Sequence, residues 1–171
     1  MITVVTGGIK SGKSSWAQKR GESISGNRAF IATALALDEE IQQRIKKHQS
    51  DRADKWTTWE EAHDIVPVLE NLTTKFGVVL LDCLTMWISN LLTIDNLSAE
   101  QVQQKTTELS ACLSGKNCQI ILVTNEVGMG IIPSDPLSRA FQGHLGRLNR
   151  EVASVANELY MMISGVPLQI K

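Results

Sequence analysis

The stretch that decides the fold is Gly7-Gly8-Ile9-Lys10-Ser11-Gly12-Lys13-Ser14. It matches the pattern G-x-x-x-x-G-K-[ST], in which glycines let the backbone wrap closely around a phosphate. An apolar run over residues 2–6 precedes it and predicts a buried strand, and a helix is expected over residues 13–21. The motif thus lies between a strand and a helix, which is the setting of a phosphate-binding loop (P-loop).

Two residues of this motif have specific expected roles. Lys13 is expected to reach the β- and γ-phosphates of a nucleoside triphosphate, and the Ser14 hydroxyl to bind Mg²⁺. A second magnesium ligand usually comes from an acid at the end of a neighbouring strand, and Asp82 follows the apolar run 78–81. The alternative is an aspartate that merely ends a strand. The guanine-reading motif [NT]KxD does not occur in the sequence, which disfavours a switch GTPase.

Outward from the P-loop, strand patterns alternate with helix patterns along the chain. Further strands are expected over 28–33, 76–81, 119–124, 159–163 and 166–170, and further helices over 38–51, from 64, over 84–92, from the capping box at Ser98 and Gln101 to Gly115, and over 137–159. Residues 52–63 are expected to be turns, with Trp56 and Trp59 as packing anchors. This order predicts an α/β fold, a mostly parallel sheet with helices on both faces in three α/β/α layers.

The long helix over 137–159 has the clearest pattern in the chain. Its apolar residues recur every three or four positions, at Leu137, Phe141, Leu145, Leu148, Val152, Val155 and Leu159. Such a stripe is more often a core face than a subunit contact, and the sequence alone leaves both open.

A length of 171 residues without an internal repeat or linker predicts a single domain over residues 1–171, and 43 % hydrophobic and 20 % charged residues are ordinary for a globular protein. The net charge of −1 favours neither nucleic acid nor acidic membranes as partners. Three cysteines without a CxxC pair argue against a disulfide framework and fit a reducing cytosol. No signal peptide or membrane span is expected, so a cytoplasmic protein is predicted.

A histidine lies within a basic segment. His48 is four residues after Arg44 and four before Arg52, so all three share a face if the helix holds. Flanking cations disfavour protonation of the imidazole, which would leave a neutral nucleophile able to attack an α-phosphate. A solvated basic face with an incidental histidine is the commoner origin of such a pattern, and the residues alone favour it. His63 and His144 lack a comparable setting and are expected to be structural or exposed.

At this point the whole chain resembles a known family, the bifunctional adenosylcobinamide kinase/adenosylcobinamide-phosphate guanylyltransferase of cobalamin assembly. The two most specific motifs are the segment Arg44-Ile45-x-x-His48-x-x-x-Arg52 and the stretch 124–133, TNEVGMGIIP. The other matching parts are Thr6 through Ser14, Trp56-x-Thr58-x-Glu60, Asp82-Cys83-Leu84-Thr85, Asn90-Leu91-Leu92, Gly146-Arg147-x-Asn149 and the stretch 164–168, SGVPL.

The resemblance implies a function and a set of site residues. His48 would attack GTP and carry GMP as a phosphoramidate, which reverses the interpretation from the residues alone. The further nucleotide contacts implied are Ala32, Thr33, Ala34, Gln49, Ser50, Asp51, Arg52, Glu60 and Asp82. The enzyme would use ATP or GTP with Mg²⁺ to phosphorylate adenosylcobinamide, then transfer GMP to adenosylcobinamide phosphate. A RecA-like P-loop fold and a homotrimer are also implied.

The chain departs from the family pattern at two places. Lys10 stands where many relatives have arginine, which keeps the charge but loses the planar fork. Ala53 stands in a segment where proline is frequent, so the spacing of the following turn could differ. Glu126, after the strand predicted over 119–124, is a candidate for a polar role in the kinase step, and a carboxylate that caps a turn is the alternative.

Two other functions remain open from the sequence. One is a small-molecule kinase that uses the P-loop and never forms a histidine adduct. The other is a nucleotide-gated binding module that only hydrolyses its nucleotide slowly. The basic strip around His48 favours the transferase over both, and the resemblance carries most of that preference.

Overall fold

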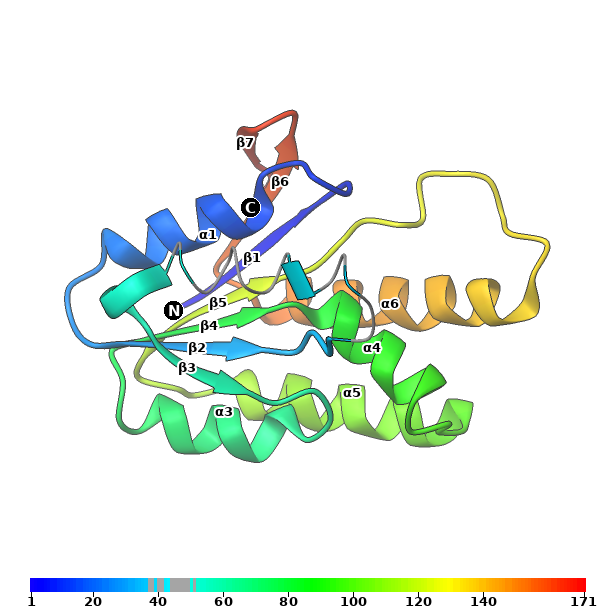
Figure 1. Ribbon diagram of the computed structural model, residues 1–171, viewed down its shortest axis with the longest axis horizontal. Coiled ribbons are helices and arrows are strands. Elements are labelled where there is room, and N and C mark those ends of the chain that lie inside the picture. Colours follow the sequence, from blue (N-terminus) through cyan, green and yellow to red (C-terminus); the bar gives the residue numbers. More distant parts are fainter. Residues whose placement is uncertain (37–38, 40–41, 44–49, 51) are drawn as a thin grey trace.

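The structure is a computed structural model that describes residues 1–36, 39, 42–43, 50 and 52–171 (Figure 1). The helix expected over 38–51 falls mostly outside these residues. His48, Arg44, Gln49 and Asp51 lie outside the described residues as well.

The described strands form one seven-stranded sheet in the order β3-β2-β4-β5-β1-β6-β7. The strands are β1 (Ile2–Gly7), β2 (Arg28–Ala32), β3 (Thr57–Glu60), β4 (Val78–Asp82), β5 (Gln119–Val123), β6 (Glu158–Ile163) and β7 (Val166–Gln169). Neighbours pair in parallel except β6 and β7, which form an antiparallel hairpin. The mostly parallel sheet expected from the sequence is confirmed.

Helices cover both faces of this sheet. The described helices are α1 (Lys13–Glu22), α3 (Ile65–Thr73), α4 (Leu84–Thr93), α5 (Ala99–Leu113) and α6 (Pro136–Val155), with a short 3₁₀ helix η1 (Ala53–Lys55). Figure 1 shows α1 on one side of the sheet and α3, α5 and α6 on the other. The three-layer architecture is therefore confirmed.

The buried core follows from the alternation of side chains along the central strands. On β4, Val79 and Leu81 pack into the larger core, whereas Val78 and Leu80 pack into the smaller one beside α1. Because both faces are covered, β4 reads as a continuous apolar run rather than an alternating one. Among the described helices, none has the length and apolar character that crossing a bilayer requires.

Several helix boundaries follow from local chemistry. Ser98 and Gln101 form the expected capping box, with the Ser98 backbone N–H donating to Gln101 Oε1 at 2.8 Å. Gly115 has φ +71°, the left-handed conformation with which a helix commonly ends. The apolar helix α4 is buried along most of its length, as its composition predicts.

The expectation of turns over residues 52–63 was wrong, because β3 lies within this range. Among the described strands, β3 is at the edge of the sheet and pairs only with β2, and Trp59 is its one partly buried residue. It therefore lacks the apolar pattern that marks a covered strand. Trp56 and Trp59 are anchors as expected, and they pack into the cores on opposite faces of the sheet.

The helix expected over 137–159 ends earlier, at Val155. Leu159 belongs to β6, where it pairs with Val4 of β1, so its place in the helical pattern is coincidental. Within α6, Leu145, Leu148 and Val152 are fully buried. The C-terminal half of the stripe is thus a core face.

Candidate functional site

The P-loop joins β1 to α1, and two glycines allow its path. Gly7 has φ +143°, and a Cβ built there would lie 2.5 Å from the carbonyl oxygen of Met162 on β6. Gly12 has φ +92° and immediately precedes α1. Larger residues would be strained at both positions. The phosphate-binding motif therefore adopts the glycine-dependent strand–loop–helix arrangement expected from the sequence.

The lysine of the motif is held inside the loop. Lys13 is only 7 % exposed, and its ammonium Nζ donates a hydrogen bond of 2.6 Å to the carbonyl oxygen of Gly8. Lys10 and Ile9 are exposed at the tip, and Lys10 has φ +55°. Two cations and the positive end of α1 thus come together in one short loop, which suits a polyanionic ligand.

Segments from two neighbouring strands support the loop. The Gly165 N–H, in the turn between β6 and β7, donates to the Ser11 carbonyl oxygen at 3.1 Å. The Glu126 N–H, just after β5, donates to the Gly7 carbonyl oxygen at 3.1 Å. The loop is therefore fixed from both sides of β1.

Strand register brings the other predicted contacts to the same edge of the sheet. Glu60 pairs with Ala32, Ala32 with Asp82, Asp82 with Val123, and Val123 with Val5. These residues form one level row across five strands, and the row crosses β1 two residues before the P-loop begins. Since ligands of open α/β sheets bind beyond the carboxyl ends of the strands, this row defines the floor of the candidate site.

Asp82 and Ser14 have the chemistry of magnesium ligands. Asp82 ends β4, which is separated from β1 by one strand, so the two strands lie about 10 Å apart. Ser14 is in the first turn of α1, and both residues are partly exposed. In the described part of the chain no group of three or more His, Cys, Asp or Glu side chains could hold a metal. A hydroxyl and a carboxylate fit Mg²⁺, which commonly takes one or two protein ligands beside phosphate oxygens.

Thr33 and Arg52, both implied nucleotide contacts, are buried. The Thr33 hydroxyl donates to the Cys83 carbonyl oxygen at 2.7 Å and accepts from the Cys83 N–H at 2.8 Å. The Arg52 guanidinium lies 4.0 Å from the centre of the Phe30 ring, and the residue is 4 % exposed. Ser50 is exposed, and Ala34 is partly exposed after β2.

Glu126, a candidate from the sequence, and Cys83, which directly follows Asp82, have a clear structural setting. The Glu126 carboxylate accepts a hydrogen bond of 2.7 Å from the Gly128 N–H and so caps a turn. Burial raises the pKa of the Cys83 thiol to about 11, and the charge of Asp82 adds to this rise. A thiol with so high a pKa stays protonated near neutral pH and is a poor nucleophile.

Three polar residues in the region were missed as individual positions by the sequence reasoning. Asn90 on α4 is 1 % exposed and donates to the carbonyl oxygens of Thr33 and Ala62. Asn149 on α6 accepts from the Thr124 hydroxyl and donates to the Asn125 carbonyl oxygen. Thr85 accepts from the Asn125 N–H at 2.7 Å. For Asn90 the available signal was an amide inside a nearly all-apolar helix, because a buried amide has to find partners.

Comparison with solved structures shows the same fold at low sequence identity. A type III secretion system ATPase matches with a TM-score of 0.57 and 11 % identity, over 94 % of this chain and 50 % of that one. The RadB recombinase matches with a TM-score of 0.50 and 14 % identity, over 94 % and 73 %. This chain thus spans about half the length of the secretion ATPase. These likenesses support the P-loop NTPase fold of RecA type.

Comparison with sequences gives a match over nearly the whole chain. The bifunctional adenosylcobalamin biosynthesis protein CobU of Escherichia coli (strain K12) is 34 % identical over 185 residues, covering 100 % of both chains. The CobP protein of the same description from Pseudomonas aeruginosa is 32 % identical over 171 residues, covering 100 % of this chain and 98 % of the relative. The family model described as cobinamide kinase / cobinamide phosphate guanyltransferase matches residues 3–170. The chain therefore belongs to this family, the CobU family.

Proposed function

We propose that this protein catalyses two consecutive steps of cobalamin biosynthesis, phosphorylation of adenosylcobinamide and transfer of GMP from GTP to adenosylcobinamide phosphate. The observation that carries the proposal is the family match over residues 3–170. The P-loop between β1 and α1, with Asp82 at the same edge of the sheet, supports it because phosphoryl transfer depends on positioning and charge stabilisation.

In the kinase step, the P-loop holds the triphosphate of ATP or GTP. The Lys13 ammonium gives up its hydrogen bond to the Gly8 carbonyl oxygen and instead donates to oxygens of the β- and γ-phosphates. Backbone N–H groups at the start of α1 donate to the remaining phosphate oxygens. The hydroxyl oxygen of the cobinamide side chain attacks the γ-phosphorus, the nucleoside diphosphate leaves, and the hydroxyl proton is released. We assign Glu126 as acceptor of that proton, because its N–H is bonded to the first glycine of the P-loop.

In the guanylyltransferase step, His48 is the nucleophile. A neutral imidazole nitrogen attacks the α-phosphorus of GTP, a P–N bond forms, and pyrophosphate leaves. A phosphate oxygen of adenosylcobinamide phosphate then attacks the same phosphorus, the P–N bond breaks, and adenosylcobinamide-GDP is released. The sequence motif around His48 supports this role, and Gln49, Ser50, Asp51, Arg52, Ala32, Thr33, Ala34 and Glu60 are proposed as contacts to the nucleotide.

We infer that both steps use Mg²⁺, held by Ser14 and Asp82 together with the phosphates. When bound, the ion neutralises charge on the transferring phosphoryl group. The hydroxyl of Ser14 and the carboxylate of Asp82 provide the hard oxygen ligands that it prefers.

Three parts of the proposal rest on the sequence and the family resemblance. They are a single catalytic domain over residues 1–171, assembly as a homotrimer, and action in the cytoplasm. The trimer is tested by light scattering of the purified protein, and a monomeric mass at working concentration would contradict it.

The proposed function is tested by measuring whether the labelled α-phosphate of GTP becomes covalently attached to the protein. Purified protein is incubated with Mg²⁺ and GTP labelled at the α-phosphate, then denatured, beside His48→Asn. Acid-labile, alkali-stable label that is lost in the variant is the expected result. Folded, GTP-binding protein that retains no label would contradict the guanylyl-histidine step and leave a P-loop kinase or a nucleotide-gated module.

A further inference from the structure

The carboxyl ends of β2, β3 and β4 are connected by one buried polar network. Asn90 Nδ2 donates to the Thr33 carbonyl oxygen at 2.9 Å and to the Ala62 carbonyl oxygen at 3.1 Å. Thr33 follows β2, and Ala62 follows β3. Both protons of one amide are thus used to join two chain segments that are otherwise joined at this edge by the Glu61 N–H to Ala32 carbonyl bond of 2.9 Å.

The third segment joins through Thr33. Its hydroxyl exchanges two hydrogen bonds with the backbone of Cys83, which directly follows Asp82. The Thr33 N–H donates to the Asp82 carbonyl oxygen at 3.2 Å. The position of Asp82 therefore depends on Thr33, and the position of Thr33 depends on Asn90.

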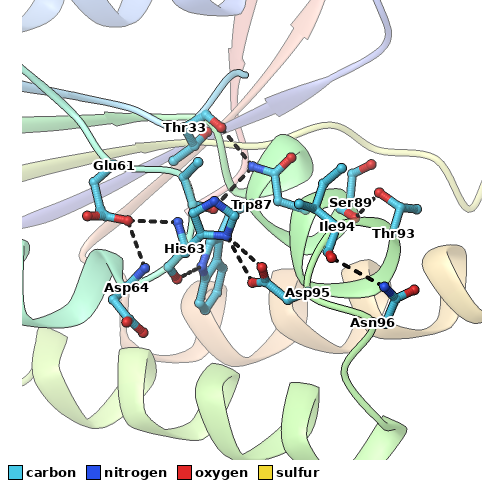
Figure 2. A network of polar contacts seen from close by, with 12 residues as sticks. Thr33, Glu61, His63, Asp64, Trp87, Ser89, Thr93, Ile94, Asp95 and Asn96 are labelled. Atoms are coloured by element: carbon cyan, nitrogen blue, oxygen red, sulfur yellow. Dashed lines mark hydrogen bonds and ion pairs between the residues drawn. The ribbon is translucent and has the colours of Figure 1, made fainter. Parts of the chain in front are cut away.

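The segment after β3 is itself fixed by short polar contacts. Figure 2 shows the Glu61 carboxylate turned toward the N–H groups of His63 and Asp64, at 2.8 and 2.9 Å. The Trp87 indole N–H donates to the His63 carbonyl oxygen at 2.8 Å, and His63 Nδ1 lies 2.8 Å from an Asp95 carboxylate oxygen. These contacts attach the segment to α4 and to the residues that follow α4. The chain directly after Glu60 is therefore held in place.

Because this network is buried, loss of the Asn90 amide would leave carbonyl oxygens without a hydrogen-bond donor. Asn90 is 1 % exposed and Thr33 is fully buried, so water cannot replace a lost donor without entering the core. A carbonyl oxygen left without a partner there would be relieved only by movement of its segment. The three segments that would move carry Ala32, Ala34, Glu60 and Asp82.

We propose that Asn90 is a positioning residue for nucleotide binding, which holds the segments after β2, β3 and β4 at the spacing that the base and ribose of the nucleotide require. This inference rests on the proposed function, which places nucleotide contacts on these segments. The P-loop lies beyond β5 from β4, so Asn90 reaches the phosphates only indirectly, through Asp82 and the Mg²⁺ proposed there, whereas it supports the nucleoside through the segments after β2 and β3. Its removal should therefore weaken recognition of the nucleoside more than recognition of the triphosphate.

The experiment compares a ligand that has a nucleoside with one that lacks it. Binding of GTP and of inorganic tripolyphosphate, each with Mg²⁺, is measured by calorimetry on wild type and Asn90→Ala. Asn90→Ala is expected to weaken GTP binding about tenfold and to leave tripolyphosphate binding within about twofold of wild type. Asn90→Ser is the milder variant, because a hydroxyl donates one hydrogen bond instead of two, and an intermediate loss is expected.

Two further variants separate positioning from general damage. Leu109→Ala removes a fully buried side chain on α5, so it lowers the unfolding temperature without touching this edge, and both ligands should bind as in wild type. Lys13→Met should weaken both ligands. Unchanged GTP affinity in folded Asn90→Ala, equal weakening of both ligands, or a matching loss in Leu109→Ala would each overturn the inference. Absence of GTP binding by wild type would instead overturn the proposed function, and this inference with it.

Discussion

Lys13 Nζ donates a hydrogen bond of 2.6 Å to the carbonyl oxygen of Gly8, so the side chain of this lysine folds back onto the backbone of the P-loop. The ammonium is nearly buried and already points into the loop, at a place where it can exchange one oxygen partner for another. A triphosphate entering the loop therefore meets a cation that is pre-positioned, and little side-chain entropy is lost on binding.

Lys13→Met tests the role of this cation. Methionine retains most of the apolar stem, so the free energy of unfolding should change by no more than about 1 kcal/mol. Affinity for GTP should fall about 100-fold, because a charged hydrogen bond to phosphate is lost. Calorimetry gives the affinity and urea unfolding gives the stability. Near-wild-type affinity would contradict the assignment of Lys13 to the phosphates.

Gly7→Ala tests the conformation of the loop. Gly7 has φ +143°, and a Cβ would lie 2.5 Å from the Met162 carbonyl oxygen. We expect a loss of about 2–3 kcal/mol in the free energy of unfolding, measured by urea titration. Gly8→Ala is the matched control for stability, because no heavy atom of the described residues, apart from its chain neighbours, lies within 4 Å of a Cβ placed there. An equal effect of both substitutions would mean that crowding at Gly7 is not the cause.

Cys83 predicts a specific loss of stability at high pH. Its pKa is raised to about 11, so above about pH 8.5 the unfolded chain loses this proton while the folded chain keeps it. The free energy of unfolding should then fall with rising pH, by at most about 1.4 kcal/mol per pH unit, until the folded thiol ionises.

The matched variant is Cys83→Ser, which removes the thiol but keeps an atom able to accept from the Met86 N–H, as Cys83 Sγ does at 3.4 Å. The difference between the two proteins in urea unfolding, followed from pH 8 to about pH 10.5, isolates Cys83 from other groups. Parallel curves would show that the thiol is not protected by the fold.

Asn149 is expected to couple energetically to Thr124. The Thr124 hydroxyl is fully buried and donates to Asn149 Oδ1 at 2.7 Å, and Asn149 Nδ2 donates to the Asn125 carbonyl oxygen at 2.9 Å. Asn149→Ala should cost about 1–3 kcal/mol of unfolding free energy, since it leaves buried groups without partners.

A double-mutant cycle measures this coupling. In Thr124→Val the hydroxyl is already absent, so adding Asn149→Ala should cost at least about 0.5 kcal/mol less than it does in wild type. Additive effects would mean that the two side chains stabilise the segment after β5 independently.

The strands that carry the site could be predicted because they are covered on both faces. Runs such as 78–81 are apolar throughout, which is typical of a strand covered on both faces. The spacing of the glycines and lysine in the P-loop is specific for a phosphate-binding loop. The edge strand β3 has little buried surface, so its sequence carried no comparable signal.

The level row from Glu60 to Val5, and the bridging by Asn90, could not be predicted from the chain alone. They depend on strand order, which brings together residues far apart in the sequence. Leu159 illustrates the converse error, because an apolar residue in a following strand continued a helical pattern by chance.

Glu126 should separate the two proposed reactions. Its N–H bond to Gly7 places it beside the P-loop, and its carboxylate accepts from the Gly128 N–H at 2.7 Å. Glu126→Gln keeps an oxygen that can accept this bond, so the turn and GTP binding should persist. A neutral amide cannot take up a proton, so phosphorylation of cobinamide should slow by about 10²–10⁴-fold.

In the labelling of His48 by GTP, the attacking group is a neutral imidazole nitrogen and no hydroxyl has to lose a proton. This reaction should therefore proceed at the wild-type rate in Glu126→Gln. Both rates are measured on one preparation, the first by phosphocobinamide formed and the second by retained α-phosphate label. Glu126→Ala removes the cap as well, and it should also increase proteolysis within 126–132. If Glu126→Gln phosphorylates cobinamide as fast as wild type, the carboxylate only caps a turn, and the proton has another acceptor.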